Sequence, residues 1–215
     1  MKSPIPFWHL GDPVAPLRDL LQRGGVLAIP TESSYGLGAD PRNPAGVETV
    51  YRIKRREAGK PLPVVVADRA QLGGLGIDPG LPILDALFAC WPGPLTAVLP
   101  LAQRLPASAG GNRLAVRVPG HAGLRALLAE LGHGLTATSA NRSGGEPMLD
   151  PAELRSLLAG EEAVVVDGGV LPGGPPSTLV AIEESGPVVL RTGSYPVDRL
   201  RELLDELGRQ EERQS

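Results

Sequence analysis

Residues 26–40 read VLAIPTESSYGLGAD, and this stretch decides the fold class of the chain. The apolar run VLAIP predicts a buried strand over 26–30, whereas the polar and glycine-containing residues after it predict a loop. The segment before the strand predicts a helix from Asp12 to Gly25, with Asp12 as its N-cap. The segment after the loop predicts a second helix, which Asn43 caps and Pro44 opens. A strand between two helices indicates an α/β protein.

The rest of the chain continues this alternation of strands and helices. Helices are predicted at 81–91, at 122–131, from Asp150 and, as an amphipathic C-terminal helix, at about 197–213. Strands are predicted at 62–67, 95–101, 114–119, 135–139, 163–167, 178–182 and 187–191. Helices interleave with strands early and strands cluster late, which predicts an α/β fold around a mixed β-sheet with flanking helices. A length of 215 residues favours a single domain over 1–215.

The composition excludes several classes of function. A net charge of −3 shows no overall basic footprint, so any site for a polyanion must be local. Cys90 is the single cysteine, which excludes an internal disulfide, and its apolar surroundings in sequence predict a buried side chain. The three histidines are far apart in sequence, so no zinc or other metal centre built by the protein is predicted. No segment approaches the ~20 apolar residues of a membrane span and no signal peptide is evident, so we expect a cytoplasmic protein.

A basic cluster follows the second predicted helix. Residues 52–60, RIKRREAGK, carry Arg52, Lys54, Arg56 and Lys60, with Arg55 between them. Because neighbouring residues at a helix end point in different directions, these cations do not form one solvated stripe, and some of them are candidates for binding phosphate. The alternative is a helix C-terminus whose cations complement the helix dipole. No Walker A motif occurs, and GLGADP lacks the third glycine of a dinucleotide fingerprint.

Other candidate anion ligands lie at the ends of predicted strands. Arg117 in LAVRVP and Arg191 in VVLRTG each alternate with apolar residues, so each guanidinium faces either solvent or an anionic partner. The loop at 138–145, TSANRSGG, offers hydroxyls, an amide and unhindered backbone N–H groups, which suit a phosphate or a ribose. These are also ordinary turn residues, so the loop taken alone is a weak indication.

The order of these motifs resembles that of the YrdC/TsaC family. The family's P-T-E-T-x-Y-G-L-G pattern is matched by IPTESSYGLGAD at 29–40, and its K-x-R block by residues 54–56. P-G-P-L-T is matched at 92–96, A-V-R-x-P-x-H at 115–121 and S-A-N-x-S-G at 139–144. Ser177 and Arg191 match late positions of the family, and the resemblance covers residues of about 20–193.

The resemblance implies a twisted, concave α/β fold and the activity of an L-threonylcarbamoyladenylate synthase. Such an enzyme condenses L-threonine, bicarbonate and ATP to threonylcarbamoyl-AMP and pyrophosphate for the modification of tRNA. The residues that would bind threonine are Thr31, Ser33, Tyr35, Arg117 and Ser177. Those that would bind ATP are Lys54, Arg56, Lys60, Ser139, Asn141 and Arg191, with Lys54 and Arg56 as the catalytic pair. Magnesium is expected to accompany ATP, held mostly by phosphate oxygens and water.

Two other functions remain open on the sequence. The same fold could serve as a non-catalytic RNA-binding module, although aromatic residues make up only 3% of the chain and offer few platforms for stacked bases. It also occurs as a domain of enzymes that use carbamoyl phosphate, but the zinc-finger and acylphosphatase-like regions of those enzymes are absent from this sequence. For a synthase, the resemblance implies transfer of the product to a TsaD/TsaB/TsaE-type complex, with weak binding of tRNA or RNA as a further expectation.

Overall fold

The computed structural model describes residues 5–57, 59–183 and 186–214. Its helices are α1 (Ala15–Gln22), α2 (Pro44–Lys54), α3 (Ala70–Gly73), α4 (Ile83–Cys90), α5 (Ala122–Leu131), α6 (Pro151–Leu157) and α7 (Val197–Gln214), with a short 3-10 helix at Pro106–Ser108. Its strands are β1 (Phe7–Trp8), β2 (Val26–Pro30), β3 (Tyr35–Gly38), β4 (Val64–Val65), β5 (Leu95–Pro100), β6 (Arg113–Arg117), β7 (Leu135–Thr136), β8 (Thr138–Ser139), β9 (Ala163–Val166), β10 (Thr178–Glu183) and β11 (Gly186–Arg191).

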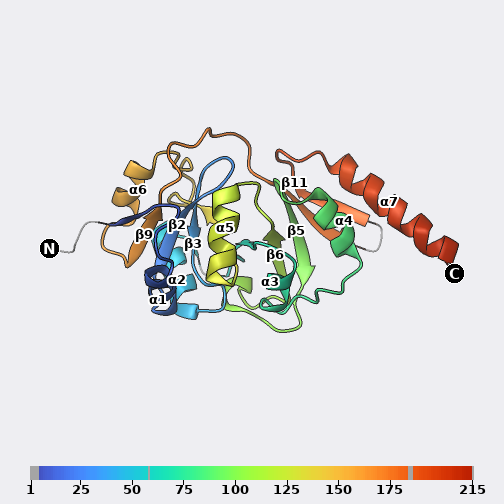
Figure 1. Cartoon of the computed structure of the whole chain (residues 1–215), viewed down its shortest axis with the longest axis horizontal. Coiled ribbons are helices and arrows are strands. Elements are labelled where there is room, and N and C mark those ends of the chain that lie inside the picture. The colour runs from blue at the N-terminus through green and yellow to red at the C-terminus, as the bar shows by residue number, and fades with distance from the viewer. Residues whose placement is uncertain (1–4, 58, 184–185, 215) are drawn as a thin grey trace.

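The strands form two mixed sheets that lie side by side (Figure 1). The first has the order β1-β9-β2-β3-β8, and the second has the order β11-β10-β5-β6-β4-β7. Both contain parallel and antiparallel pairs; for example, β2 runs parallel to β9 and antiparallel to β3. The predicted α/β class with mixed pairing and flanking helices is confirmed, and the strands are divided between two sheets.

The segment predicted as one strand at 135–139 is divided between the sheets. Leu135 and Thr136 pair with β4 in the second sheet, whereas Thr138 and Ser139 pair with β3 in the first. Ala137 lies at the switch. The hydroxyl of Thr136 accepts a hydrogen bond from the N–H of Ala39 at 2.9 Å, so β7 is also tied to the end of β3. Two backbone edges compete for this segment, and each one pairs with half of it.

Strand β2 is buried on both faces, which explains its unbroken apolar sequence. Val26 and Ala28 belong to the larger core cluster, and Leu27 and Ile29 belong to the smaller one. The smaller cluster also contains the apolar face of α5, which lies centrally between the sheets (Figure 1). Burial of a side chain of this kind contributes about 1.5–3 kcal/mol, so β2 is a main source of stability for both clusters.

Of the two N-terminal helices, α1 does not have the predicted N-cap, whereas α2 does. Helix α1 follows Val14 and not Asp12, because the carboxylate of Asp12 instead accepts a hydrogen bond from the N–H of His9 at 2.7 Å. Asn43 does cap α2, accepting from the N–H of Ala45 at 3.0 Å. Its amide group donates to two carbonyls at the end of α1, so one side chain both starts a helix and joins it to its neighbour.

Helix α2 ends at the basic cluster, as the sequence predicts. Arg55 follows Lys54 in the left-handed conformation, with φ of 49°. This turn separates the directions of its neighbours, because Lys54 is buried while Arg55 is exposed and Arg56 is half-buried. The cluster is therefore not one charged stripe on the surface.

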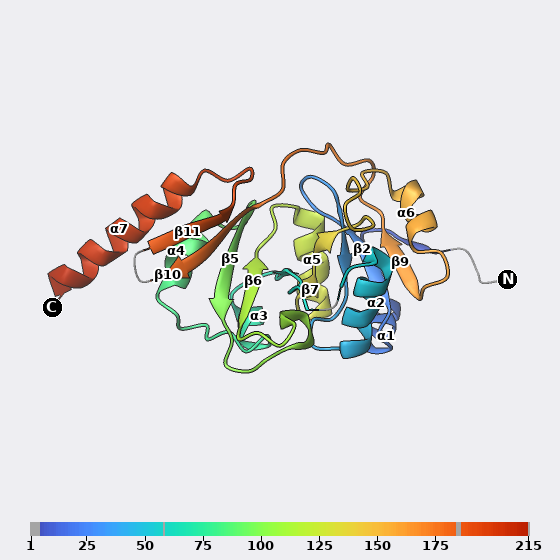
Figure 2. The ribbon, with the colours of Figure 1, turned by 180° about the vertical axis from the view of Figure 1, so that it is seen from behind.

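One long connection and the C-terminal helix complete the fold. Residues 167–177, called here the strap, lead from β9 in the first sheet to β10 in the second and arch over the molecule (Figure 2). Helix α7 packs against α4 and β11, with Leu200 fully buried, and its C-terminal half projects from the body (Figure 1). Cys90 is buried at the end of α4, as predicted. None of the helices in the described ranges is both long and apolar enough to cross a membrane.

Candidate functional site

A cleft of about 950 Å³ lies between the two sheets and carries most of the residues singled out in the sequence. Its walls come from the turn after β2, the end of α2, strands β5 and β6, the loop after β8 and the strap. The predicted site residues that line it are Thr31, Ser33, Lys54, Arg56, Arg117, Ser139, Asn141, Ser177 and Arg191. Motifs separated by up to about 160 residues of sequence are thus collected in one cavity.

Lys54 joins the end of α2 to the loop after β8. Its ammonium donates to the carbonyl of Ser139 at 2.5 Å, to the side-chain oxygen of Asn141 at 2.8 Å and to the carbonyl of Asn141 at 3.3 Å. The hydroxyl of Ser139 also donates to the Asn141 side chain, at 2.7 Å. The three N–H directions of the ammonium therefore all meet oxygen atoms of this loop, which fixes the loop in place.

The charge of Lys54 is not neutralised by a carboxylate among the residues that the structure describes. Burial, and secondly the charge of Arg56, lower the pKa of Lys54 to about 8. Arg56 lines the same cleft, again with no ion pair in the described ranges. Because a desolvated cation without a counter-ion is unfavourable, this end of the cleft is suited to receive an anion.

A second cationic group stands on the other wall of the cleft. Arg191, at the end of β11, donates to the carbonyl of Ser177 at 2.9 Å and to its hydroxyl at 3.2 Å. The Ser177 hydroxyl is also within 2.8 Å of the hydroxyl of Thr96. Burial, and secondly the charge of Arg117, lower the pKa of Arg191. The charges of the two arginines are thus near enough to disfavour each other, an arrangement that an anion stabilises.

Arg117 differs from the other cations because it has an ionic partner. Its guanidinium donates to the carboxylate of Glu32 at 2.9 Å, and the same carboxylate accepts a hydrogen bond from the N–H of Gly120. The side chains are 12% and 26% exposed, so solvent screens this pair only partly. Glu32 belongs to the turn between β2 and β3, and Arg117 ends β6, so the pair links the two sheets.

The turn between β2 and β3 presents its hydroxyl groups to the cleft. The hydroxyl of Thr31 donates to the carbonyl of Ser34 at 2.7 Å and so closes this turn. The carbonyl of Ser33 accepts a hydrogen bond from the N–H of Gly173 at 2.9 Å, which ties the turn to the strap. The Thr31 oxygen keeps acceptor capacity after its own donation, and the Ser33 side chain also faces the cleft wall.

Two of the predicted site residues do not line the cleft. Tyr35 is fully buried, and its hydroxyl accepts from the N–H of Gly168 at 3.0 Å and donates to the carbonyl of Gly169 at 2.8 Å. Desolvation, the largest cause, raises its pKa. Lys60 is exposed, and its carbonyl accepts a hydrogen bond from the Tyr51 hydroxyl at 2.7 Å. Tyr35 therefore anchors the start of the strap, and Lys60 lies outside the cavity.

Several polar residues of the cleft were not predicted as site residues. They are Ser34, Thr96, Asn112, Arg113, Thr138 in β8, Ser143 and Glu146. Thr96 is the last residue of the P-G-P-L-T motif, so its position in that motif could have identified it as a site residue. Arg113 opens β6 on the same strand as Arg117, and the two-residue period of a strand places both on one face. Apart from Thr138, the remaining polar residues of this set lie in turns, where their types carry little information.

His121 shows that a motif residue can have a purely structural contact. It ends the motif at 115–121, and its Nδ1 accepts a hydrogen bond from the N–H of Leu124 at 3.1 Å, so it is the N-cap of α5. Desolvation lowers its pKa, which favours the neutral imidazole that this acceptor role requires.

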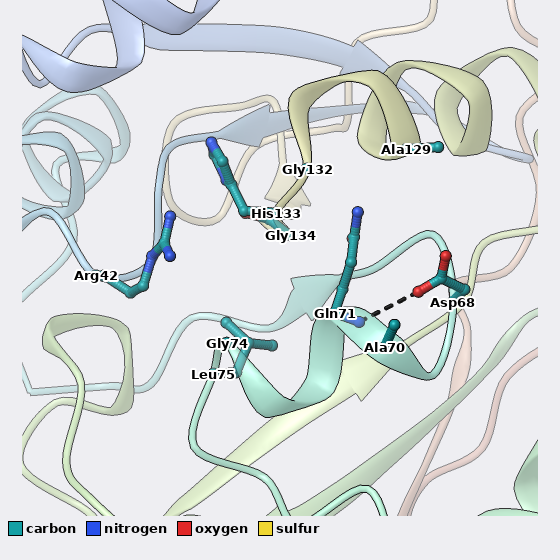
Figure 3. A pocket seen from close by; sticks show the side chains of 10 residues that line it. All are labelled: Arg42, Asp68, Ala70, Gln71, Gly74, Leu75, Ala129, Gly132, His133 and Gly134. Carbon is teal, nitrogen blue, oxygen red and sulfur yellow. Dashed lines mark hydrogen bonds between the residues drawn. The ribbon is translucent and has the colours of Figure 1, made fainter.

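A second hollow, of about 310 Å³, lies beside α3 and the end of α5 (Figure 3). Its polar side chains are engaged by the protein itself. The side chain of Gln71 donates to the carbonyl of Leu128 and accepts from the N–H of Ala67, and Arg42 pairs with Asp40. The larger cleft is therefore the better candidate, because its Lys54, Arg56 and Arg191 have no carboxylate partner among the described residues.

Comparisons with known proteins give consistent matches over most of the chain. The family model for Sua5, YciO and YrdC, described as telomere recombination, matches residues 19–193. Threonylcarbamoyl-AMP synthase of Alkalilimnicola ehrlichii is 41% identical over 175 residues, which are 79% of this chain and 90% of the relative. Threonylcarbamoyl-AMP synthase of Thiobacillus denitrificans is also 41% identical, over 76% of this chain and 88% of the relative.

Solved structures agree with these matches. Sua5 of P. abyssi complexed with L-threonine superposes with a TM-score of 0.78 at 29% identity, covering 94% of this chain and 61% of the other. The present chain thus spans about three fifths of the length of that Sua5 chain. YciO of E. coli superposes with a TM-score of 0.76 at 25% identity, covering 93% of this chain and 100% of the other.

Proposed function

The chain belongs to the Sua5/YciO/YrdC family, and from this membership and the cleft we infer that it is a threonylcarbamoyl-AMP synthase acting in tRNA modification. The observation that supports the inference most is the gathering of Lys54, Arg56 and Arg191 in one cleft without carboxylate partners among the described residues. ATP and threonine are its substrates, and we further propose that it acts as a nucleotidyltransferase, with bicarbonate as the third substrate.

The proposed reaction has two bond-forming steps. The amine of threonine attacks the carbon of bicarbonate, and the carbon–hydroxyl bond breaks as that hydroxide leaves with one N–H proton as water, which gives an N-carboxylate. An oxygen of this carboxylate then attacks the α-phosphorus of ATP, and the bond to the β-phosphate oxygen breaks as pyrophosphate leaves. Several anions must be held together in this step, so positioned cations and backbone donors carry the catalysis and no protein nucleophile is needed.

We propose that the two ends of the cleft bind different substrates. Lys54, Arg56 and the loop with Ser139 and Asn141 receive the phosphates of ATP, and Arg191 binds the nucleotide from the other wall of the cleft. Threonine occupies the end formed by the 31–34 turn, Arg117 and Ser177. Tyr35 supports this pocket through the start of the strap, without lining the cleft.

Magnesium enters this proposal only as a companion of ATP. Glu146 supplies the one carboxylate among the residues lining the cleft, and no group of three potential metal ligands occurs among the described residues. These residues do not fit a cage in which the protein supplies the ligands. Phosphate oxygens and water are therefore the ligands expected for Mg²⁺.

The release of pyrophosphate tests the proposal. We expect purified protein to release pyrophosphate from ATP only when threonine and bicarbonate are both present, and without tRNA. A strict requirement for tRNA, or release that ignores threonine, contradicts it. Tight RNA binding without any pyrophosphate release would instead indicate an RNA-binding module.

The product must pass to a second activity, because a mixed anhydride with AMP is an activated acyl donor. We propose that a TsaD/TsaB/TsaE-type complex accepts the threonylcarbamoyl group and transfers it to tRNA. Weak binding of tRNA or RNA to the cationic cleft is a further proposal, which a filter-binding measurement at two salt concentrations tests.

A further inference from the structure

Glu32 is close to the cleft without being part of its wall. The residues on either side of it, Thr31 and Ser33, line the cavity, whereas Glu32 does not. Its carboxylate is directed to Arg117 and to the N–H of Gly120. Arg117, which does line the cavity, is the side chain through which the carboxylate of Glu32 reaches the cleft.

Arg117 needs a carboxylate partner because a second arginine, Arg191, lies nearby. Arg191 is near enough for its pKa to be lowered by the charge of Arg117. In an empty cleft the two guanidinium groups repel each other, and a long side chain without a fixed contact adopts many rotamers. The contact with Glu32 at 2.9 Å holds Arg117 in one place while leaving other N–H groups of its guanidinium to donate into the cleft.

The backbone N–H of Gly120 is also held by the carboxylate of Glu32, to which it donates a hydrogen bond. A Cβ atom at Gly120 would lie 3.1 Å from the Glu32 Oε1 and 3.2 Å from its Cγ. Glycine therefore permits the close approach by which the loop after β6 donates to Glu32. The side chain that ends β6 and a backbone N–H of the loop after it thus both donate to one carboxylate from the opposite sheet.

We propose that Glu32 is a positioning residue that fixes Arg117 for the carboxylate of threonine and so sets the affinity for the amino acid without touching it. The proposal rests on the function proposed above. It assigns to Glu32 an effect on threonine that is separate from binding of the nucleotide, because the Lys54 end of the cleft has its own contacts.

The first test compares two substrates in one variant. Glu32→Gln keeps the size of the side chain and removes its charge, so we expect KM for threonine to rise by about 10-fold or more while KM for ATP changes less than about 3-fold. Glu162→Gln is the matched control, because Glu162 pairs with Arg23 in an exposed ion pair outside the cleft. The control should leave both constants near those of the unaltered protein.

The second test asks whether Glu32 acts through Arg117. Arg117→Ala should raise KM for threonine more than Glu32→Gln, and adding Glu32→Gln to Arg117→Ala should change it less than about 2-fold further. If the two increases in KM for threonine multiply in the double variant, the proposal is overturned. Equal rises in KM for threonine and ATP in Glu32→Gln overturn it as well, because they indicate general damage to the cleft.

A third variant covers the case in which Glu32→Gln fails to fold. Gly120→Ala moves the carboxylate without removing its charge, so it should raise KM for threonine selectively, and an unchanged KM overturns the proposal. The unaltered protein separates this inference from the proposed function. Absence of pyrophosphate release in that protein overturns the function itself, whereas normal release with an unaffected Glu32→Gln variant overturns only the role of Glu32.

Discussion

The ammonium of Lys54 donates to the side-chain oxygen of Asn141 over 2.8 Å, although the two residues are 87 positions apart in sequence. This contact joins a helix end to the loop after β8 and presents the Ser139 hydroxyl at a fixed place beside it. The proposed phosphate site is thus held together before a ligand arrives, and such a site requires little reorganisation during a reaction, which is the main electrostatic advantage of an enzyme over water.

The lowered pKa of Lys54 predicts a pH dependence of ATP binding. The pKa of Lys54 is about 8, so the ammonium is charged at a pH below this value and loses its proton as the pH rises through it. The dissociation constant of ATP, measured by calorimetry, should therefore increase by about 10-fold or more between pH 7 and 9.5. Lys54→Arg keeps the charge throughout, so its dissociation constant should change much less. The same slope in both proteins would show that another group titrates.

The two arginines near the end of α2 should differ strongly in importance. Arg56 lines the cleft, whereas Arg52 forms an ion pair with Glu161 at 2.6 Å outside it. An exposed pair contributes under about 1 kcal/mol, but a donor to a transferring phosphate contributes about 3 kcal/mol. Arg56→Ala should lower kcat/KM by about 100-fold or more, and Arg52→Ala by less than about 3-fold. Comparable losses in the pyrophosphate assay would mean that the cluster acts only as surface charge.

Arg56→Lys provides a finer comparison at the same position. The lysine keeps the charge but loses the two parallel N–H groups with which arginine binds phosphate oxygens. Activity should lie between that of Arg56→Ala and that of the unaltered protein. Full recovery would indicate that only charge matters there.

The hydroxyl groups of the cleft predict the choice of amino acid. Thr31, Ser33 and Ser177 surround the proposed threonine site, so the substrate hydroxyl should be hydrogen-bonded and its methyl group only packed. Serine lacks the methyl group, a deficit of roughly 10–200-fold, whereas valine leaves hydroxyl partners unpaired, at roughly 10⁴-fold or more. The order of kcat/KM should be threonine, serine, then valine. A rate for valine that equals that for serine contradicts this assignment.

Tyr35→Phe should affect stability more than activity. The hydroxyl makes two hydrogen bonds, to Gly168 and Gly169, in a fully buried position. Its removal should lower the free energy of unfolding in urea by about 1–3 kcal/mol and change KM for threonine by less than about 3-fold. Tyr51→Phe, which loses one hydrogen bond to Lys60, is the control and should cost about 1 kcal/mol or less. Unchanged stability with a raised KM would place Tyr35 in the substrate pocket.

Local signals explain which parts of the fold the sequence could predict. The strand at 26–30, the Asn43 cap and the helix at 122–131 match the structure because neighbouring residues determine them. Strand β3 was expected to be a loop, since its sequence YGLG has two glycines, and it is a strand because β2 and β8 pair with it on both sides. Such pairing is a tertiary effect that local propensity does not contain.

The candidate site shows the same division. Nine of the eleven residues expected from the order of the motifs line one cleft, whereas Tyr35 and Lys60 do not line it. Their residue types suited the site, but the direction of a side chain depends on packing. Glu32 was not singled out because its partner, Arg117, is 85 positions away in sequence.

The switch at Ala137 also limits how the cleft can move. Ala137 and Thr138 line the cavity, and one residue separates β7 in one sheet from β8 in the other. Because consecutive Cα atoms are ~3.8 Å apart, the two sheets cannot separate by more than about 7 Å at this point. The covalent chain therefore fixes the distance between the two sheets at this part of the cleft wall. Any widening of the cleft must therefore take place away from Ala137, where the two sheets are not joined by so short a connection.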